Sequence, residues 1–251
     1  MKNIRMVARG ALAVAAATFL VACGGGSDDA TAVSAEGIWV GSVGGDTDAD
    51  RVLLVVLGDG TYYGVYGDAT GTYGLIQGTA SSSGNNLVSG NGRDYGFGMG
   101  VPYGFSLSAT VSSQSSLVGT ATYAAPILAS VSYALSYDSS YGDPVTLLEL
   151  AGAYSGTVGS LAGVSLASLT ISTTGALAAV SDTGCRVSGQ LSPRGSTAVF
   201  DLTAALDAAT CGQAINVQGI AGLTGVDRNA LAFAAVTADR SDALFGVASR
   251  P

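Results

Sequence analysis

Histidine is absent from this chain of 251 residues, and its only lysine is Lys2. Without an imidazole group the chain has no histidine base, no histidine-dependent catalytic triad and no histidine metal ligand. Charged residues make up only 11% of the chain, and 18 acidic residues against 10 basic ones give a formal net charge of −8. Phosphate backbones repel such a chain, so nucleic acid is not an expected partner.

Cysteine is also scarce, at three residues: Cys23, Cys185 and Cys211. None of them has the Cys-x-x-Cys spacing that is typical of redox and zinc sites. The chain has neither a glycine-rich phosphate loop nor a Gly-x-Ser-x-Gly nucleophile elbow. We therefore expect no metal, no cofactor and no catalytic residue, which favours a protein that is not an enzyme.

The N-terminal residues have the layout of a secretory signal peptide. Lys2, Arg5 and Arg9 precede an apolar run over residues 11–22, which at about 12 residues is shorter than the roughly 20 that a membrane-spanning helix needs. The run ends in Leu20-Val21-Ala22-Cys23, which resembles the lipobox of bacterial lipoproteins.

The lipobox resemblance implies that residues 1–22 are removed and that Cys23 carries acyl chains such as palmitate. Three chains anchor a protein firmly, because each buried methylene contributes about 0.8 kcal/mol. In that family Asp after the cysteine retains the protein in the inner membrane, so Gly24 implies the outer membrane, with the periplasmic or surface-facing leaflet undetermined. Residues 23–35 are small and polar and predict a flexible tether.

With Cys23 assigned to lipid, Cys185 and Cys211 remain as an even pair in an oxidising compartment. This count predicts a disulfide bond between them.

The rest of the chain repeats one pattern twice. Gly37-Ile38-Trp39-Val40-Gly41 resembles Gly152-Ala153-Tyr154-Ser155-Gly156 at an offset of 115 residues (152 minus 37), and Gly60 and Gly175 have the same offset. We therefore predict two copies of one domain, over residues 36–142 and 143–251.

Each copy shows the two-residue periodicity of strands that bury one face, and glycine and polar breaks separate the strands. In the first copy we predict strands at 37–43, 51–57, 61–66, 74–81, 86–94, 104–112, 116–124 and 129–137. In the second copy we predict strands at 152–159, 166–172, 176–181, 185–191, 197–203, 214–222, 230–236 and 243–249. Eight short antiparallel strands favour a small closed barrel, with a β-sandwich as the alternative.

A short helix is predicted between the copies. Asp143 has the features of an N-cap and Pro144 suits the first helical position. Leu147 and Leu150 then lie on one side of the helix, which we expect to plug one end of a barrel.

The opening Gly37-Ile38-Trp39 with about eight meandering strands is similar to the Gly-x-Trp start of the calycin barrels, the lipocalins and avidins. The lipid-anchored double barrel also resembles the transferrin-binding-protein-like surface lipoproteins. In those families the tryptophan packs across the barrel floor, which is the role that the resemblance implies for Trp39. The second copy departs from this pattern, because Tyr154 replaces the tryptophan.

Two acidic motifs resemble sites of known chemistry. Asp182-Thr183-Gly184 resembles the motif of aspartic proteases, but the second copy that this chemistry requires is missing. We therefore interpret the motif as a tight turn. A hydrolase that uses Asp182 is the alternative function. Residues 46–50, Asp-Thr-Asp-Ala-Asp, resemble a calcium loop, but Arg51 and Leu57 stand where an EF-hand has Gly and Glu. We interpret this segment as a solvated loop, with a weak cation site as the alternative.

Residues 95–105 set aromatic side chains among glycines, which is typical of loops that hold a sugar, a lipid or a partner protein at a barrel mouth. An edge strand with turns is the alternative. The possible binding residues are Tyr95, Phe97, Met99, Tyr103 and Phe105.

The sequence thus predicts a lipid-anchored lipoprotein of the outer membrane with a non-enzymatic binding or structural role. Its partners are the membrane and either an unknown protein or a small apolar ligand. A filled barrel favours the protein partner, and a hollow barrel favours the small ligand.

Overall fold

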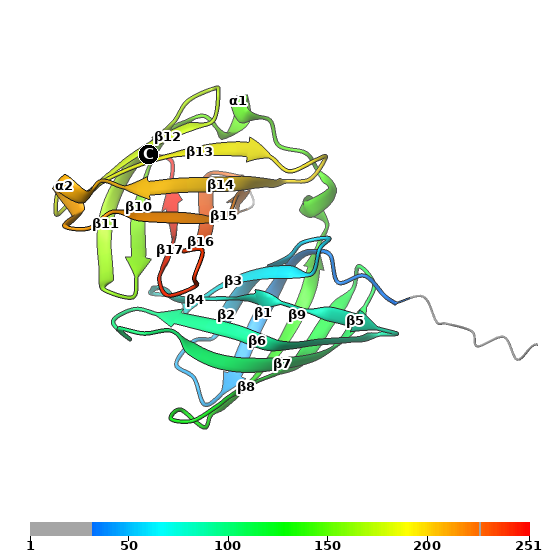
Figure 1. The fold of residues 1–251 in the computed structure, drawn as a ribbon. Coiled ribbons are helices and arrows are strands. Elements are labelled where there is room, and N and C mark those ends of the chain that lie inside the picture. Colours follow the sequence, from blue (N-terminus) through cyan, green and yellow to red (C-terminus); the bar gives the residue numbers. More distant parts are fainter. Residues whose placement is uncertain (1–31, 226) are drawn as a thin grey trace, which may run out of the picture. The chain divides into compact units, whose positions relative to one another are not determined.

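Two closed antiparallel barrels of eight strands each make up most of the chain (Figure 1). The computed structural model describes residues 32–225 and 227–251. The predicted signal peptide, the lipobox with Cys23 and most of the tether lie outside these described residues. Within them, no helix is long and apolar enough to span a bilayer.

Barrel 1 is a meander in which successive strands of the ring pair, β4 pairs with β6, and pairing of the first strand, β1, with the last, β9, closes the ring. A short strand, β5 (Ser81–Ser83), adds to the edge of β6. The ring strands are β1 (Gly37–Gly45), β2 (Arg51–Val56), β3 (Thr61–Asp68), β4 (Gly71–Thr79), β6 (Asn86–Gly96), β7 (Tyr103–Ser112), β8 (Ser116–Tyr123) and β9 (Ser130–Asp138).

Barrel 2 repeats the meander and closes by pairing of its first strand with its last. Its strands are β10 (Gly152–Ser160), β11 (Gly163–Ile171), β12 (Ala176–Ser181), β13 (Arg186–Pro193), β14 (Val199–Leu206), β15 (Ile215–Thr224), β16 (Ala230–Val236) and β17 (Ala243–Ser249). The predicted fold of two eight-stranded barrels is confirmed, and neither copy is a sandwich.

The first strands of the two barrels carry equivalent aromatic anchors. The indole Nε1 of Trp39 donates a hydrogen bond to the carbonyl oxygen of Ala35 at 2.8 Å, and Trp39 is fully buried. The hydroxyl of Tyr154 donates in the same way to the carbonyl oxygen of Leu150, also four residues earlier, at 2.6 Å. Tyrosine therefore replaces tryptophan without loss of the polar contact.

Gly60 and Gly175 also occupy equivalent turns. Both have a left-handed backbone, with φ of +82° and +83°. A Cβ atom would lie 2.3 Å from the carbonyl oxygen of Ala80 at Gly60, and 2.2 Å from that of Leu191 at Gly175. Only glycine satisfies both conditions, which explains why the sequence repeats it at this offset.

Short helices connect the barrels, and their caps differ from the prediction. A 3₁₀ turn, η1 (Ser139–Gly142), is capped by Asp138, and α1 (Leu147–Leu150) follows. The predicted N-cap Asp143 and first helical residue Pro144 are wrong, because Thr146 and Glu149 form a capping box that starts the helix later. Leu150 is fully buried in the core of barrel 2. The division into domains at residue 142 stays a prediction.

Some strands bury both faces, contrary to the expected alternation. Strand β7 alternates as predicted, but β2 is buried or half-buried from Val52 onward. Its inner residues belong to the core of barrel 1, whereas Val55 and Leu57 join Val199 and Ile220 of barrel 2 in a shared apolar cluster. The uninterrupted apolar run over residues 52–57 was the signal for this burial on both sides.

Candidate functional site: cavities within the two barrels

The interior of barrel 1 is hollow at one end, where it encloses a cavity of about 620 Å³. Pockets that bind small ligands span roughly 300–1,000 Å³. In a meander, alternate connections lie at the same end, and residues from three of them line this cavity: Asp48 between β1 and β2, Met99 between β6 and β7, and Ile127 between β8 and β9. This end is therefore the mouth of barrel 1.

The other end of barrel 1 is filled. Trp39 is fully buried there, and its ring meets the edge of Tyr137 at a centroid distance of 5.3 Å. The expected role of Trp39 as a floor residue agrees with this packing. The cavity thus has one closed end and one open end.

A buried carboxylate on β6 lines the cavity. Asp94 is 4% exposed, and each of its two oxygens accepts one hydrogen bond. Tyr66 on β3 donates its hydroxyl proton to Oδ1, and Tyr123 on β8 donates to Oδ2, both at 2.6 Å. Two donors on opposite oxygens match the needs of an ionised carboxylate, which only accepts hydrogen bonds.

Burial acts on the titration of all three groups. Desolvation raises the pKa of Asp94, although the hydrogen bonds from Tyr123 and Tyr66 act in the opposite direction. Desolvation, followed by the neighbouring charge of Asp94, raises the pKa of Tyr66 and that of Tyr123 above the ordinary tyrosine value. Both phenols therefore keep their protons at neutral pH and act as donors.

Gly74 on β4 gives Tyr66 the room to reach Asp94. A Cβ atom at Gly74 would lie 2.2 Å from the hydroxyl oxygen of Tyr66. Any larger residue there displaces the tyrosine and breaks one of the two hydrogen bonds to Asp94. The site consequently depends on four strands, β3, β4, β6 and β8, that only barrel closure brings together.

The structure separates the five residues of the predicted binding segment into two groups. Phe97, Met99 and Tyr103 line the cavity of barrel 1. Tyr95 is fully buried on the opposite face of β6, where its hydroxyl donates to the carbonyl oxygen of Arg240 at 3.1 Å. Phe105 belongs to the core of barrel 1. Three of the five therefore line a space that a ligand can enter, although Phe97 also stacks on Phe245 of barrel 2, and the other two pack within the protein.

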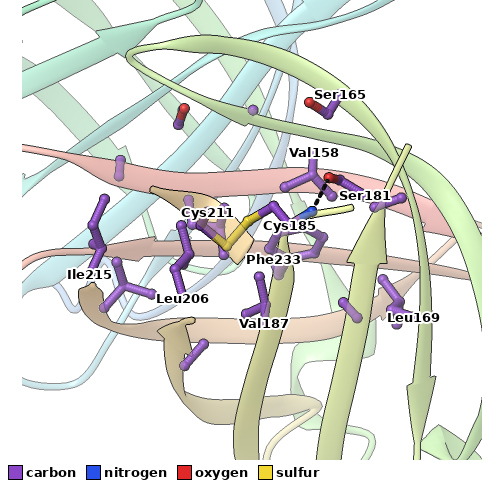
Figure 2. Close-up of a pocket in the computed structure, with 18 of the residues that line it drawn as sticks. Val158, Ser165, Leu169, Ser181, Cys185, Val187, Leu206, Cys211, Ile215 and Phe233 are labelled. Atoms are coloured by element: carbon purple, nitrogen blue, oxygen red, sulfur yellow. Dashed lines mark hydrogen bonds between the residues drawn. A yellow bond between two sulfur atoms is a disulfide. The ribbon is translucent and has the colours of Figure 1, made fainter. Parts of the chain in front are cut away.

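Barrel 2 holds a smaller cavity, of about 250 Å³ (Figure 2). Aliphatic side chains dominate its lining, including Leu169, Val187 and Ile215, with Phe233 among them. Among the described residues, Asp242 is the one charged residue in this lining, and its carboxylate accepts hydrogen bonds from the backbone of Ala243 and Leu161. This cavity offers apolar contact with few polar groups.

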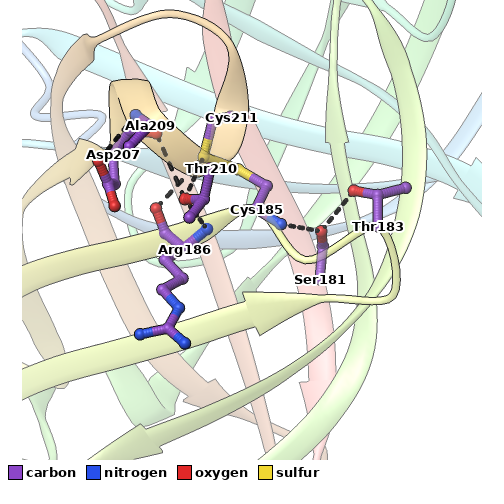
Figure 3. The surroundings of a disulfide bond; sticks show 8 residues. All are labelled: Ser181, Thr183, Cys185, Arg186, Asp207, Ala209, Thr210 and Cys211. Atoms are coloured by element: carbon purple, nitrogen blue, oxygen red, sulfur yellow. Dashed lines mark hydrogen bonds between the residues drawn. A yellow bond between two sulfur atoms is a disulfide. The ribbon is translucent and has the colours of Figure 1, made fainter.

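The disulfide bond between Cys185 and Cys211 is present and forms part of this lining. It ties the turn after β12 to α2 (Ala208–Cys211), between β14 and β15 (Figure 3). The backbone N–H of Arg186 donates to the hydroxyl of Thr210 at 3.0 Å, which joins the same two segments. The crosslink fixes one rim of barrel 2.

The two acidic motifs have local roles. Asp182 is exposed in a turn in which the N–H of Gly184 donates to the carbonyl oxygen of Ser181 at 2.9 Å, as the turn interpretation requires. Asp46 and Asp50 contact different partners, the backbone of Ser130 and the side chain of Arg51. Throughout residues 32–225 and 227–251, no group of three or more acidic or cysteine side chains is placed to hold a metal ion.

Asp94, Tyr66 and Tyr123 were missed by sequence reasoning. Asp94 lies beside the predicted segment, but a carboxylate inside a predicted strand gives no sign of which face it occupies. The available signal was a tyrosine at an inward position of β3 and another at an inward position of β8. These positions can be recognised as inward only after the register of the strands is known.

Comparison with known proteins finds similarity among solved structures but not among sequences. No family model and no curated protein sequence matches the chain. Among solved structures, the chain is similar to the vaccine antigen transferrin binding protein B of Haemophilus parasuis, solved as a tryptophan-to-alanine mutant, with 7% identity and a TM-score of 0.26. The match covers 81% of this chain and 65% of that chain, so the chain spans less than two thirds of its neighbour.

Proposed function

We propose that this chain is a lipid-anchored lipoprotein of the outer membrane whose barrel 1 binds a small, largely apolar ligand. The observation that carries the proposal is the open cavity of about 620 Å³, which combines aromatic walls with the buried carboxylate of Asp94. A few placed polar groups in an apolar cavity are typical of ligand sites. The proposed role is recognition, and Asp182 takes no part in it.

The anchor is proposed on the N-terminal sequence alone. Lys2, Arg5 and Arg9, the apolar run and the Leu-Val-Ala-Cys ending agree with a lipoprotein signal. Changing Cys23 to Ser removes the thiol that accepts the lipid, so we expect an uncleaved precursor without label after growth with radioactive palmitate. Label incorporated into the Cys23→Ser protein contradicts the anchor.

Ligand binding is tested with the neutral fluorescent probe N-phenyl-1-naphthylamine, whose emission rises in apolar surroundings. The purified full chain, kept below the micelle concentration of any detergent, should bind the probe saturably. Ala121 lines the cavity of barrel 1, and Ala121→Phe should reduce probe binding at least about tenfold by filling the space.

Ala204→Phe is the matched control, because Ala204 has a similar burial but lines the cavity of barrel 2. It should leave most probe binding unchanged. Loss of binding in the Ala204 variant alone places the ligand site in barrel 2, and binding unaffected by both changes contradicts a cavity site. Circular dichroism of each variant verifies that the barrels are folded.

A further inference from the structure

We infer that barrel 1 selects an organic cation with an apolar body, such as a quaternary or protonated amine. This inference deepens the proposed function and rests on it. The charges of the lining, its aromatic content and its mouth each support it.

The charge of the cavity is of one sign. Its charged lining residues are Asp46, Asp48 and Asp94, and no arginine of the described residues lines it. The carboxyl group of Asp94 lies within an apolar space, and its hydrogen-bond partners are two neutral phenols, those of Tyr66 and Tyr123. A buried carboxylate without a cationic partner is costly, and a bound cation supplies that partner.

The walls of the cavity suit a cation that is poorly hydrated. Ammonium groups are attracted to the faces of aromatic rings within about 6 Å of the ring centre, with the strongest effect where water is excluded. Six aromatic residues line this cavity, and five of them are tyrosines: Tyr66, Tyr73, Phe97, Tyr103, Tyr123 and Tyr133.

The mouth favours the entry of cations over anions. Asp46 and Asp48 line the cavity from the connection between β1 and β2, and both side chains are exposed. A cleft lined by one sign of charge raises the local concentration of the opposite sign. An anionic amphiphile such as a fatty acid meets three carboxylates and no positive charge, so the lining disfavours it.

A bare metal ion fits this site less well than an organic cation. Calcium takes six to eight oxygen ligands at about 2.3–2.6 Å, whereas no such acidic group is assembled among the described residues. The cavity volume is also far larger than one ion needs. The remaining class is a cation with a body that fills apolar space.

The test uses a cation and a neutral compound of the same shape, together with an anion built on the same body. Phenyltrimethylammonium is the cation, tert-butylbenzene is its neutral counterpart with carbon in place of nitrogen, and 4-tert-butylbenzoate is the anion. Binding of each to the full chain is measured by competition with N-phenyl-1-naphthylamine. We expect the cation to bind at least about tenfold more tightly than the neutral compound and the anion to bind most weakly.

Asp94→Asn gives the decisive comparison, because asparagine keeps the shape of aspartate and removes its charge. We expect the variant to lose about tenfold in affinity for the cation, with the affinity for tert-butylbenzene unchanged. The exposed Asp182→Asn serves as the control and should change neither affinity. A cation affinity unchanged by Asp94→Asn overturns the inference.

The outcomes also separate this inference from the proposed function. If tert-butylbenzene binds with an affinity equal to or higher than that of the cation, and Ala121→Phe blocks this binding, cation selectivity is overturned. Barrel 1 then remains a ligand site. Failure of all three probes and of N-phenyl-1-naphthylamine overturns both.

Discussion

The two barrels share a strand plan and differ in what they enclose. Barrel 1 has a cavity of about 620 Å³ with six aromatic residues and three carboxylates, whereas barrel 2 has a cavity of about 250 Å³ with mainly aliphatic walls and a disulfide at its rim. Both keep the same anchor in the first strand, at Trp39 and Tyr154. The repeat therefore preserves the framework and leaves the interior free to change.

The strand registers explain part of this difference. In barrel 1 the pairing of β6 with β7 shifts between Ser89 and Gly92, and the pairing of β3 with β4 shifts at Tyr66. Within the described strands of barrel 2, every pairing keeps its register. Bulges are common next to functional sites because they redirect side chains. Here the shift in β6 directs Asp94 into the cavity.

Separating the barrels is the change with the largest expected effect. Residues of both barrels share two apolar clusters, and in one of them Phe97 stacks on Phe245 at a centroid distance of 5.1 Å. Exposing each such side chain costs about 1.5–3 kcal/mol. We expect residues 36–142 and 143–251, expressed alone, to melt cooperatively but at lower temperatures than the full chain. Two halves without cooperative melts contradict the assignment of two domains.

Removing the aromatic anchors tests whether the barrels are equivalent in stability. Trp39→Ala should lower the free energy of unfolding by about 3–5 kcal/mol, because it leaves a large cavity in a close-packed floor. Tyr154→Ala should cost a similar amount, since it also removes the hydrogen bond to Leu150. Urea denaturation followed by circular dichroism measures both. A loss below 1 kcal/mol for either variant shows that its anchor is dispensable and breaks the equivalence.

Removing the disulfide affects barrel 2 alone. Replacing both Cys185 and Cys211 with Ala opens a loop with a sequence separation of 26 residues, which should cost roughly 3.5 kcal/mol of stability by the loop-entropy relation. Binding of phenyltrimethylammonium to barrel 1 should not change. Thermal denaturation and probe competition measure the two quantities, and two free thiols in the unreduced protein contradict the crosslink.

The framework was accessible from the sequence because its signals are local or repeated. Alternation predicts strands such as β7, the offset of 115 residues indicates the repeat, and an even pair of cysteines predicts the disulfide. These features need no knowledge of which strands meet. The cavity residues Phe97, Met99 and Tyr103 were within reach for the same reason, since glycine-separated aromatics mark a loop.

Asp94 was out of reach because its orientation depends on a bulge. Strict alternation from Leu87 and Ser89 in β6 points Tyr95 inward and Asp94 outward, and the shift before Gly92 reverses both. A displacement of one residue exchanges the faces of every later residue. The contact of Asp94 with tyrosines 28 and 29 residues away then follows from closure of the barrel.

The smallest expected effect is a pH dependence that only barrel 1 carries. Tyr66 from β3 and Tyr123 from β8 face Asp94, Tyr73 and Tyr103 line the same cavity, and Asp46 and Asp48 lie at its mouth. The pKa of Asp94 is raised in the folded state by burial, so the folded protein binds a proton at a higher pH than the unfolded chain does. The contribution of Asp94 to stability therefore falls as pH rises from the ordinary aspartate pKa through the raised one, and it is constant above.

Asp94→Asn removes this dependence, while its amide still accepts from one phenol and donates to the other. We compare the free energy of unfolding of the variant with that of the native protein, as variant minus native. This difference should increase as pH rises through the same window. The increase should be about 1.4 kcal/mol for each unit by which burial raises the pKa of Asp94. Urea denaturation at a series of pH values measures this difference, and other carboxylates cancel from it. Cation affinity should change over the same window, because protonation of Asp94 removes the charge that the ligand meets. A difference that is independent of pH shows that Asp94 titrates alike in the folded and unfolded chains, and it contradicts the raised pKa that burial gives this carboxyl group.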